Sequence, residues 1–144
     1  MRRRRARRTV EELLSRTVEV RSVAPYVSVY PMTGRGEEPR IECSSWLHVH
    51  GYLDSPVKDV FDVTIHVHSK QALRVGTARP VAVGAIIGIH DAVSAVVSLL
   101  PLDFDRLWVL ALSGHLKFAS LTFTPPKYGS ALVVNTSFSS EREE

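Results

Sequence analysis

The chain has 144 residues, of which 44% are hydrophobic and 23% charged, and its formal net charge at pH 7 is +3. These proportions are ordinary for a globular domain and exclude a chain that is disordered throughout. The single cysteine, Cys43, excludes an intramolecular disulfide. No run of residues is long and apolar enough to predict a membrane-spanning segment, so we expect no membrane partner.

The first eight residues account for the net positive charge of the chain. Their six arginines supply +6, so the other residues together carry −3. These arginines are Arg2, Arg3, Arg4, Arg5, Arg7 and Arg8. Clustered arginines attract the phosphates of nucleic acids through counterion release, so we predict a disordered arm over 1–8 that contacts nucleic acid. The alternative is a solvated tail without a partner.

The arm also bears on where the protein is expected to act. No apolar segment follows it, so it does not match a secretory signal. We expect a protein that is not secreted, located in the cytoplasm, or in the nucleus if the source is a eukaryote or a virus.

The next residues predict a short helix and then extended structure. Thr9 and Glu12 have the spacing of a capping box, which predicts a helix near 9–16. Residues 18–31 are rich in β-branched and aromatic side chains and predict one or two strands, with an interruption at Pro25. The glycines and proline of 32–40 predict a loop.

Two segments alternate between apolar and polar residues. In 41–53 and in 59–69 the apolar side chains stand at odd positions, which is typical of strands with one buried face. We predict that the two segments form an antiparallel hairpin whose odd-numbered residues face the core. Cys43 falls on that side and is expected to be an inert core residue.

The even positions of this hairpin carry the tripeptide His-Val-His twice. Because a slip of one residue would expose the core, the two copies must share the outer face. We predict a register in which the numbers of paired residues sum to 112. It would place His50 opposite Asp62 and His48 diagonal to His66 on the outer face, and Phe61 over Gly51 on the inner face. Registers with sums of 110 or 114 would change the pairs but keep the shared face. The face is predicted to contain Trp46, His48, His50, Tyr52, Asp62, His66 and His68.

Three uses of this face remain open. It can pack against another layer or subunit, bind a partner, or hold a metal through His48, His50 and His66, because imidazoles two residues apart on a strand can chelate one ion. The first use is favoured. We expect no metal and no cofactor, and no motif predicts catalytic residues.

The second half predicts a buried strand over 81–89 and a helix near 91–100, capped by Asp91. Residues 104–112 favour a strand that turns at Ser113-Gly114, and a helix ending at Gly114 is the alternative. A last strand is predicted over 131–139, before an acidic, frayed tail at 140–144.

The sequence therefore predicts an α+β to mainly β fold, with a single antiparallel sheet or sandwich of about six or seven strands in one domain over 9–139. It favours a non-enzymatic binding or assembly protein. The β-rich domain would contact proteins, either as a homo-oligomer or with another protein, and the arm would contact nucleic acid. The alternatives are a protein-only interaction module, such as an inhibitor or accessory subunit, and a small metal-dependent enzyme that uses the histidines.

Overall fold

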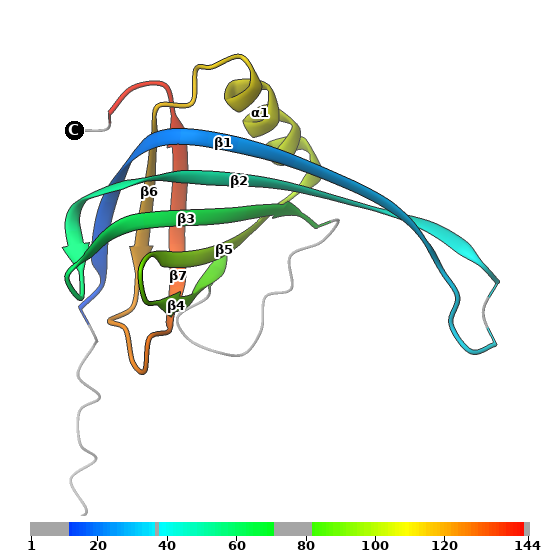
Figure 1. Ribbon diagram of the computed structural model, residues 1–144, viewed down its shortest axis with the longest axis horizontal. Coiled ribbons are helices and arrows are strands. Elements are labelled where there is room, and N and C mark those ends of the chain that lie inside the picture. Colours follow the sequence, from blue (N-terminus) through cyan, green and yellow to red (C-terminus); the bar gives the residue numbers. More distant parts are fainter. Residues whose placement is uncertain (1–11, 37, 71–81, 143–144) are drawn as a thin grey trace, which may run out of the picture.

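The structure is a computed structural model that describes residues 12–36, 38–70 and 82–142. Seven strands form one sheet that closes into a barrel, in the order β1-β2-β3-β5-β4-β7-β6, and one helix accompanies it (Figure 1). The β-rich α+β fold class predicted from the sequence is confirmed. The strands are β1 (Leu14–Met32), β2 (Arg40–Val57), β3 (Val60–Ser69), β4 (Gly84–Ile89), β5 (Val93–Leu99), β6 (Phe118–Phe123) and β7 (Ala131–Ser139).

The sheet differs from the expected antiparallel sheet or sandwich in two respects. It closes on itself, because β1 pairs with β6 as well as with β2. It also contains a parallel pair, β3 with β5, in which Val63 lies beside Val93 and Val67 beside Val97. Alternation of polar and apolar residues identifies strands and their faces, but it does not specify which strands are neighbours or how they run.

The barrel interior is filled by aliphatic side chains from all seven strands. Gly51 lets β1 approach β2 closely, because a Cβ atom at this position would lie 2.2 Å from the backbone oxygen of Glu19. Fully buried aliphatic and aromatic residues of this core include Val18, Leu47, Val49, Val63, Ile65, Val67, Ile86, Val93, Val97, Leu121, Phe123 and Val133. The core is therefore a packed interior.

The helix predicted near 91–100 is wrong, because Val93–Leu99 is strand β5. Its valines satisfy the spacing of a helix stripe, but the side chains that are buried are Val93, Ala95 and Val97, which alternate. Pairing with β3 on one side and β4 on the other gives the segment a ladder on both edges. The sequence fits both a helix and a strand, and pairing with these two neighbours selects the strand.

The helix lies in the next segment, α1 (Pro101–Leu112), where a strand was favoured. Pro101 occupies the first turn, where its missing N–H costs nothing, and Gly114 follows the helix with a φ of 79°. Phe104, Leu107 and Ala111 are buried in the barrel core. For this segment, Pro101 before the apolar residues and Gly114 after them indicate a helix more strongly than the apolar pattern indicates a strand.

The short helix predicted near 9–16 is also wrong over the residues that the structure describes. Leu14 to Arg16 belong to β1, where Leu14 pairs with Phe123 and Arg16 with Leu121. Residues 9–11 lie outside the described part of the chain. A strand replaces the helix here because the barrel needs a partner for the free edge of β6.

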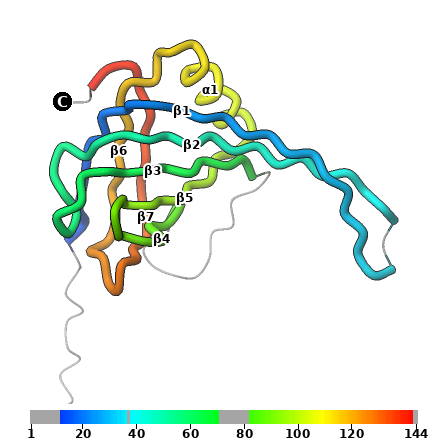
Figure 2. The backbone as a smooth tube through the Cα atoms, in the orientation of Figure 1, coloured from blue at the N-terminus to red at the C-terminus, as the bar shows by residue number. Residues whose placement is uncertain are grey.

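β1 and β2 continue far beyond the barrel as a two-stranded ribbon (Figure 2). β1 pairs with β6 only from Leu14 to Glu19, and β2 pairs with β3 from Trp46 onward. Val27–Met32 pair with Arg40–Ser45 and form the projecting part, which we call the ribbon. A β-bulge at Arg21 lies just after the residues of β1 that pair with β6, and Ser22–Tyr26 beyond it still pair with the barrel part of β2.

Candidate functional site

The two His-Val-His copies lie side by side on the outer surface of the barrel, as predicted. Trp46 pairs with His68 and His48 with His66 across β2 and β3, while Leu47, Val49, Ile65 and Val67 point into the core. The pairs sum to 114, one of the registers that keeps the shared face, rather than to 112. We call Trp46, His48, His50, Tyr52, Asp62, His66 and His68 the histidine face.

The turn between β2 and β3 and the irregular stretch before it together set the register. Lys58 and Asp59 have φ values of 47° and 65°, so they form the two-residue turn between the paired Val57 and Val60. Pro56 lies in an irregular stretch between Tyr52 and Val57 instead of at the tip. The expected cover of Gly51 by Phe61 is wrong, because Gly51 pairs with Val63 and Phe61 is exposed.

Three histidines of the face are joined to neighbours across the sheet. The Nδ1 atoms of His48 and His66 lie 2.7 Å apart, so one imidazole donates its proton to the other. His66 Nε2 also bonds Ser94 Oγ at 3.2 Å, and His68 Nε2 bonds Ser98 Oγ at 2.6 Å. The two β5 serines therefore hold the rings of the β3 histidines in place.

These surroundings oppose protonation of the two β3 histidines. Burial lowers the pKa of His66, and the neighbouring His48 lowers it further. Burial also lowers the pKa of His68, with a smaller contribution from the charge of Lys70. This part of the face is therefore neutral and apolar in character at neutral pH.

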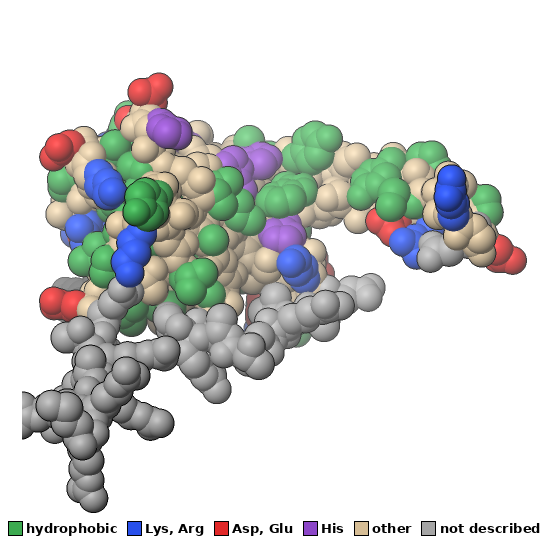
Figure 3. Space-filling view, turned by 90° about the horizontal axis from the view of Figure 1, so that it is seen from below, with side chains coloured by type: hydrophobic (Ala, Val, Ile, Leu, Met, Phe, Trp, Pro, Cys, Tyr) green, Lys and Arg blue, Asp and Glu red, His purple; other side chains and the backbone are tan. Residues whose placement is uncertain are grey.

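Aromatic stacking makes the same surface a shallow apolar pocket. Trp46 stacks on His68 with ring centroids 4.6 Å apart. The plane of the Trp46 ring is within 8° of that of the His48 ring. A pocket of about 350 Å³ opens there. It is lined by Tyr26, Trp46, His48, His66, Ile87 and Val96. Figure 3 shows the histidine side chains close to the base of the ribbon.

His50 is turned away from the histidine pair. Its Nε2 lies 3.5 Å from an oxygen of Asp62, the neighbour predicted for it, and its ring packs edge-on against Tyr52. Arg21 lies over the Tyr52 ring at 4.8 Å. The predicted ligand set of His48, His50 and His66 is not brought together, and the described residues contain no group of three or more histidine, cysteine or acidic side chains that could hold a metal.

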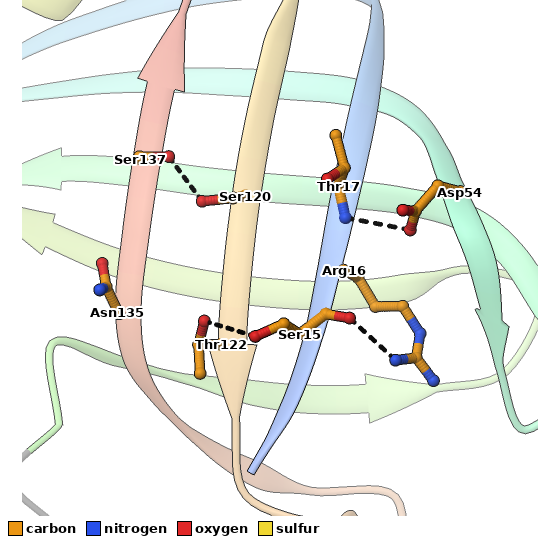
Figure 4. Close-up of a pocket in the computed structure, with 8 residues that line it drawn as sticks. All are labelled: Ser15, Arg16, Thr17, Asp54, Ser120, Thr122, Asn135 and Ser137. Atoms are coloured by element: carbon orange, nitrogen blue, oxygen red, sulfur yellow. Dashed lines mark hydrogen bonds between the residues drawn. The ribbon is translucent and has the colours of Figure 1, made fainter. Parts of the chain in front are cut away.

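The opposite side of the barrel has a different surface. The outer face over β1, β6 and β7 is a small array of hydroxyl and amide side chains in register, beside Asp54 of β2 (Figure 4). Ser15 bonds Thr122 at 3.0 Å, and the backbone N–H of Thr17 donates to Asp54. Ser120 bonds Ser137 in the same way, and Arg16, which lines the same pocket, donates to the backbone oxygens of Ser15 and Pro56. Its Nε is buried and has no hydrogen-bond partner among the described residues.

The ribbon carries exposed apolar residues that the sequence analysis did not single out. We call the face of the ribbon that continues the row of buried Leu47 and Val49 its inner face. Val27, Val29 and Ile41 lie on this face, with exposed fractions of 59%, 63% and 75%. Tyr30 is exposed on the other face, as is Tyr26 at the base of the ribbon. The signal in the sequence that could have indicated the ribbon is the length of the two segments, because both are much longer than an average strand.

Cys43 lies on the inner face of the ribbon. It pairs with Val29 and is exposed, so its assignment to the core was wrong. The side of the strand was predicted correctly, but the barrel ends before reaching this residue. Cys43 is therefore accessible to reagents that report on the ribbon.

Comparison of the chain with protein-family models, curated proteins and solved structures finds no match. The six arginines of the predicted arm lie outside the described residues. Within the described residues, no helix has both the length and the apolar character needed to cross a membrane.

Proposed function

We propose that this chain is a non-enzymatic binding and assembly protein. Its barrel domain makes protein contacts, and its N-terminal arginines contact nucleic acid in the cytoplasm or nucleus. The observation that carries the proposal is the ribbon, which leaves the barrel with exposed valines and an isoleucine on its inner face. An isolated two-stranded hairpin is marginally stable in water, so a projecting one with apolar side chains needs a partner.

The nucleic-acid contact is supported by charge. Six arginines within residues 2–8 provide an attraction to phosphates that is independent of base sequence. The remainder of the chain carries −3 and does not provide this attraction by net charge. The barrel and the arm therefore have separate tasks, one toward protein and one toward polyanions.

The nucleic-acid contact is tested by fluorescence anisotropy with labelled single- and double-stranded oligonucleotides. The intact chain should bind with a log–log salt slope of up to about −5 on duplex DNA if every arginine meets a phosphate. Replacing all six arginines by glutamine should abolish binding, whereas replacing them by lysine should preserve most of it. Binding that survives the glutamine variant, or no binding at low salt, would refute the role of the arm.

A further inference from the structure

The two long edges of the ribbon differ in the backbone groups that they offer. Val27–Met32 of β1 pair with Arg40–Ser45 of β2 (Figure 2). β1 pairs with β6 only as far as Glu19, and β2 pairs with β3 only from Trp46, so among the described residues neither side of the ribbon has a further strand. The edge of a sheet without such a neighbour presents N–H and C=O groups that another strand can bond.

The barrel part of β2 shows which of its backbone groups point toward β3. Val20 pairs with Gly51, but the N–H of Val20 donates to Lys117, just before β6. Val20 and Gly51 therefore exchange no hydrogen bonds, and the N–H and C=O groups of Gly51 point away from β1. The register skips a residue in β1 and none in β2, so every second residue of β2 from Gly51 to Ile41 points the same way.

Ile41, Cys43 and Ser45 belong to this series. Their N–H and C=O groups point toward the side of β2 that β3 occupies farther along the strand. None of the three is proline, so this edge offers three donors and three acceptors in an unbroken row. No described residue outside β1 pairs with them.

The edge of β1 is different. By the same register, the backbone groups of four residues along it point away from β2, namely those of Pro25, Val27, Val29 and Pro31. The two prolines have no N–H and cannot donate to an added strand. Prolines on an edge strand are a common protection against strand addition. The sequence therefore protects the β1 edge and leaves the β2 edge without this protection.

Resting on the proposed function, we propose that the edge of β2 at Arg40–Ser45 binds an extended segment of a partner protein, which joins the sheet as a strand. In this mode of recognition, backbone hydrogen bonds supply the affinity and alternate side chains supply the specificity. The added strand lies in line with β3, because both lie on the same side of β2. It gives the ribbon a third strand, and a two-stranded hairpin alone is marginally stable in water.

The side chains beside this edge define the class of segment. On the inner face the added strand extends the exposed apolar row of Val29, Cys43 and Ile41, so its residues on that side are apolar. Arg40 and Glu42 are paired with each other at 2.9 Å, so the edge selects neither an acidic nor a basic segment. The partner segment is therefore an uncharged one that alternates apolar and polar residues and has no proline in its paired part.

The length of the edge sets the strength of the contact. Six residues in extended conformation span about 20 Å. Such a contact is smaller than a standard protein interface, and small interfaces are typical of transient complexes. We therefore expect a weak, reversible complex.

The probe is a phage-displayed library of random nine-residue peptides, selected on the full chain. Selected peptides should show the alternating, proline-free pattern, and the affinity of labelled synthetic copies is measured by fluorescence anisotropy. Cys43→Pro removes one outward N–H and should weaken binding about tenfold, because a peptide carbonyl loses its donor and meets the proline ring. Cys43→Ala removes only the thiol and should leave the affinity within about twofold.

Val29→Pro is the matched control. Val29 lies directly opposite Cys43, and its N–H points to the edge of β1. This substitution should leave peptide binding unchanged, and circular dichroism confirms that both proline variants retain the fold. Equal weakening by the two proline variants would overturn the assignment to the β2 edge.

Amide hydrogen exchange gives a second measurement on the native chain. In the free protein the amides of Ile41, Cys43 and Ser45 should exchange faster than those of Glu42 and Ser44, which point toward β1. Saturating peptide should slow the exchange of the first three selectively. Protection of these three amides in the free protein would show that the chain itself or a second copy already covers the edge, and would overturn the proposal.

Failure of this inference is distinguishable from failure of the proposed function. Peptides that bind equally well to Cys43→Pro but lose affinity for the double variant Val27→Thr with Ile41→Thr would place the protein contact on the inner face, which refutes the edge and keeps the binding role. A selection that yields no peptide refutes the edge as well, while oligonucleotide binding by the same protein would still support the nucleic-acid role.

Discussion

The barrel half and the ribbon half of β1 and β2 have similar patterns but different environments. On one side of β2, Leu47 and Val49 are fully buried, while Ile41 and Cys43 on the same side are exposed. In β1, Val18 is buried and Val29 is not. Alternation therefore determines which side chains share a face, and closure of the barrel determines whether that face is buried. An apolar face beyond the closed part is available to another molecule.

The largest difference between the two halves is expected from truncating one apolar side chain in each. Leu47→Ala should lower the free energy of unfolding by about 2–5 kcal/mol, because it leaves a cavity in the packed core. Ile41→Ala, on the same face of the same strand, should change it by less than about 0.5 kcal/mol. Urea unfolding of dilute protein measures both. Equal effects would show that the ribbon is packed within one chain.

A smaller effect is expected from adding one methyl group inside the barrel. Gly51→Ala should destabilise the protein by about 1–3 kcal/mol, because the new Cβ would meet the backbone of Glu19 and the strands must shift. Gly88→Ala is the control, since only a ring carbon of His90 lies nearby, at 3.9 Å. It should change the free energy of unfolding by no more than about 0.5 kcal/mol. Similar melting temperatures for the two variants would contradict the close approach of β1 and β2.

The smallest effect concerns the histidine face and pH. The pKa of His66 is lowered in the folded protein, by burial and then by His48, while the unfolded chain keeps the ordinary value of 6.5. As pH falls below about 7, the unfolded chain binds more protons, so the free energy of unfolding should fall and then level off below the lowered pKa. His68, whose pKa is lowered by burial and then by Lys70, should act in the same direction.

Urea unfolding between pH 8 and pH 5 tests this dependence. His66→Gln should make the decline less steep, because glutamine does not titrate. Thr64→Val, on the same strand and face, is the control and should leave the steepness unchanged. A free energy of unfolding that rises as pH falls over this interval would contradict the lowered pKa values.

The sequence was a good guide to strand faces and a poor guide to strand partners. The parity of the two histidine copies placed them on one face, which brings His48 to His66 and His50 near Asp62. Parity did not fix the register, so the predicted pairing of His50 with Asp62 is replaced by pairing with Thr64. The same reasoning could not reveal the parallel pairing of β3 with β5 or the closure of β1 on β6, which are long-range contacts.

The two errors in helix position between residues 91 and 112 have one physical cause. Short valine-rich segments satisfy both the helix and the strand period, so the outcome depends on which segment finds strand partners. Val93–Leu99 has a strand on each side, whereas Pro101 and Gly114 mark the limits of α1. The exposed ribbon was missed because its pattern is that of a buried strand, and only the three-dimensional end of the barrel reveals it.

Barrel closure also has a consequence for synthesis of the chain. Val18 pairs with Leu53 on one side, 35 residues later, and with Ala119 on the other, about 100 residues later. Contacts between such distant residues form slowly, because loop-closure entropy opposes them. At ribosomal speeds of about 5–20 residues per second, roughly 3–12 seconds separate the emergence of β2 from that of β6. During this interval the nascent hairpin exposes the core residues of β1 and β2, and it is a substrate for chaperones that bind apolar segments.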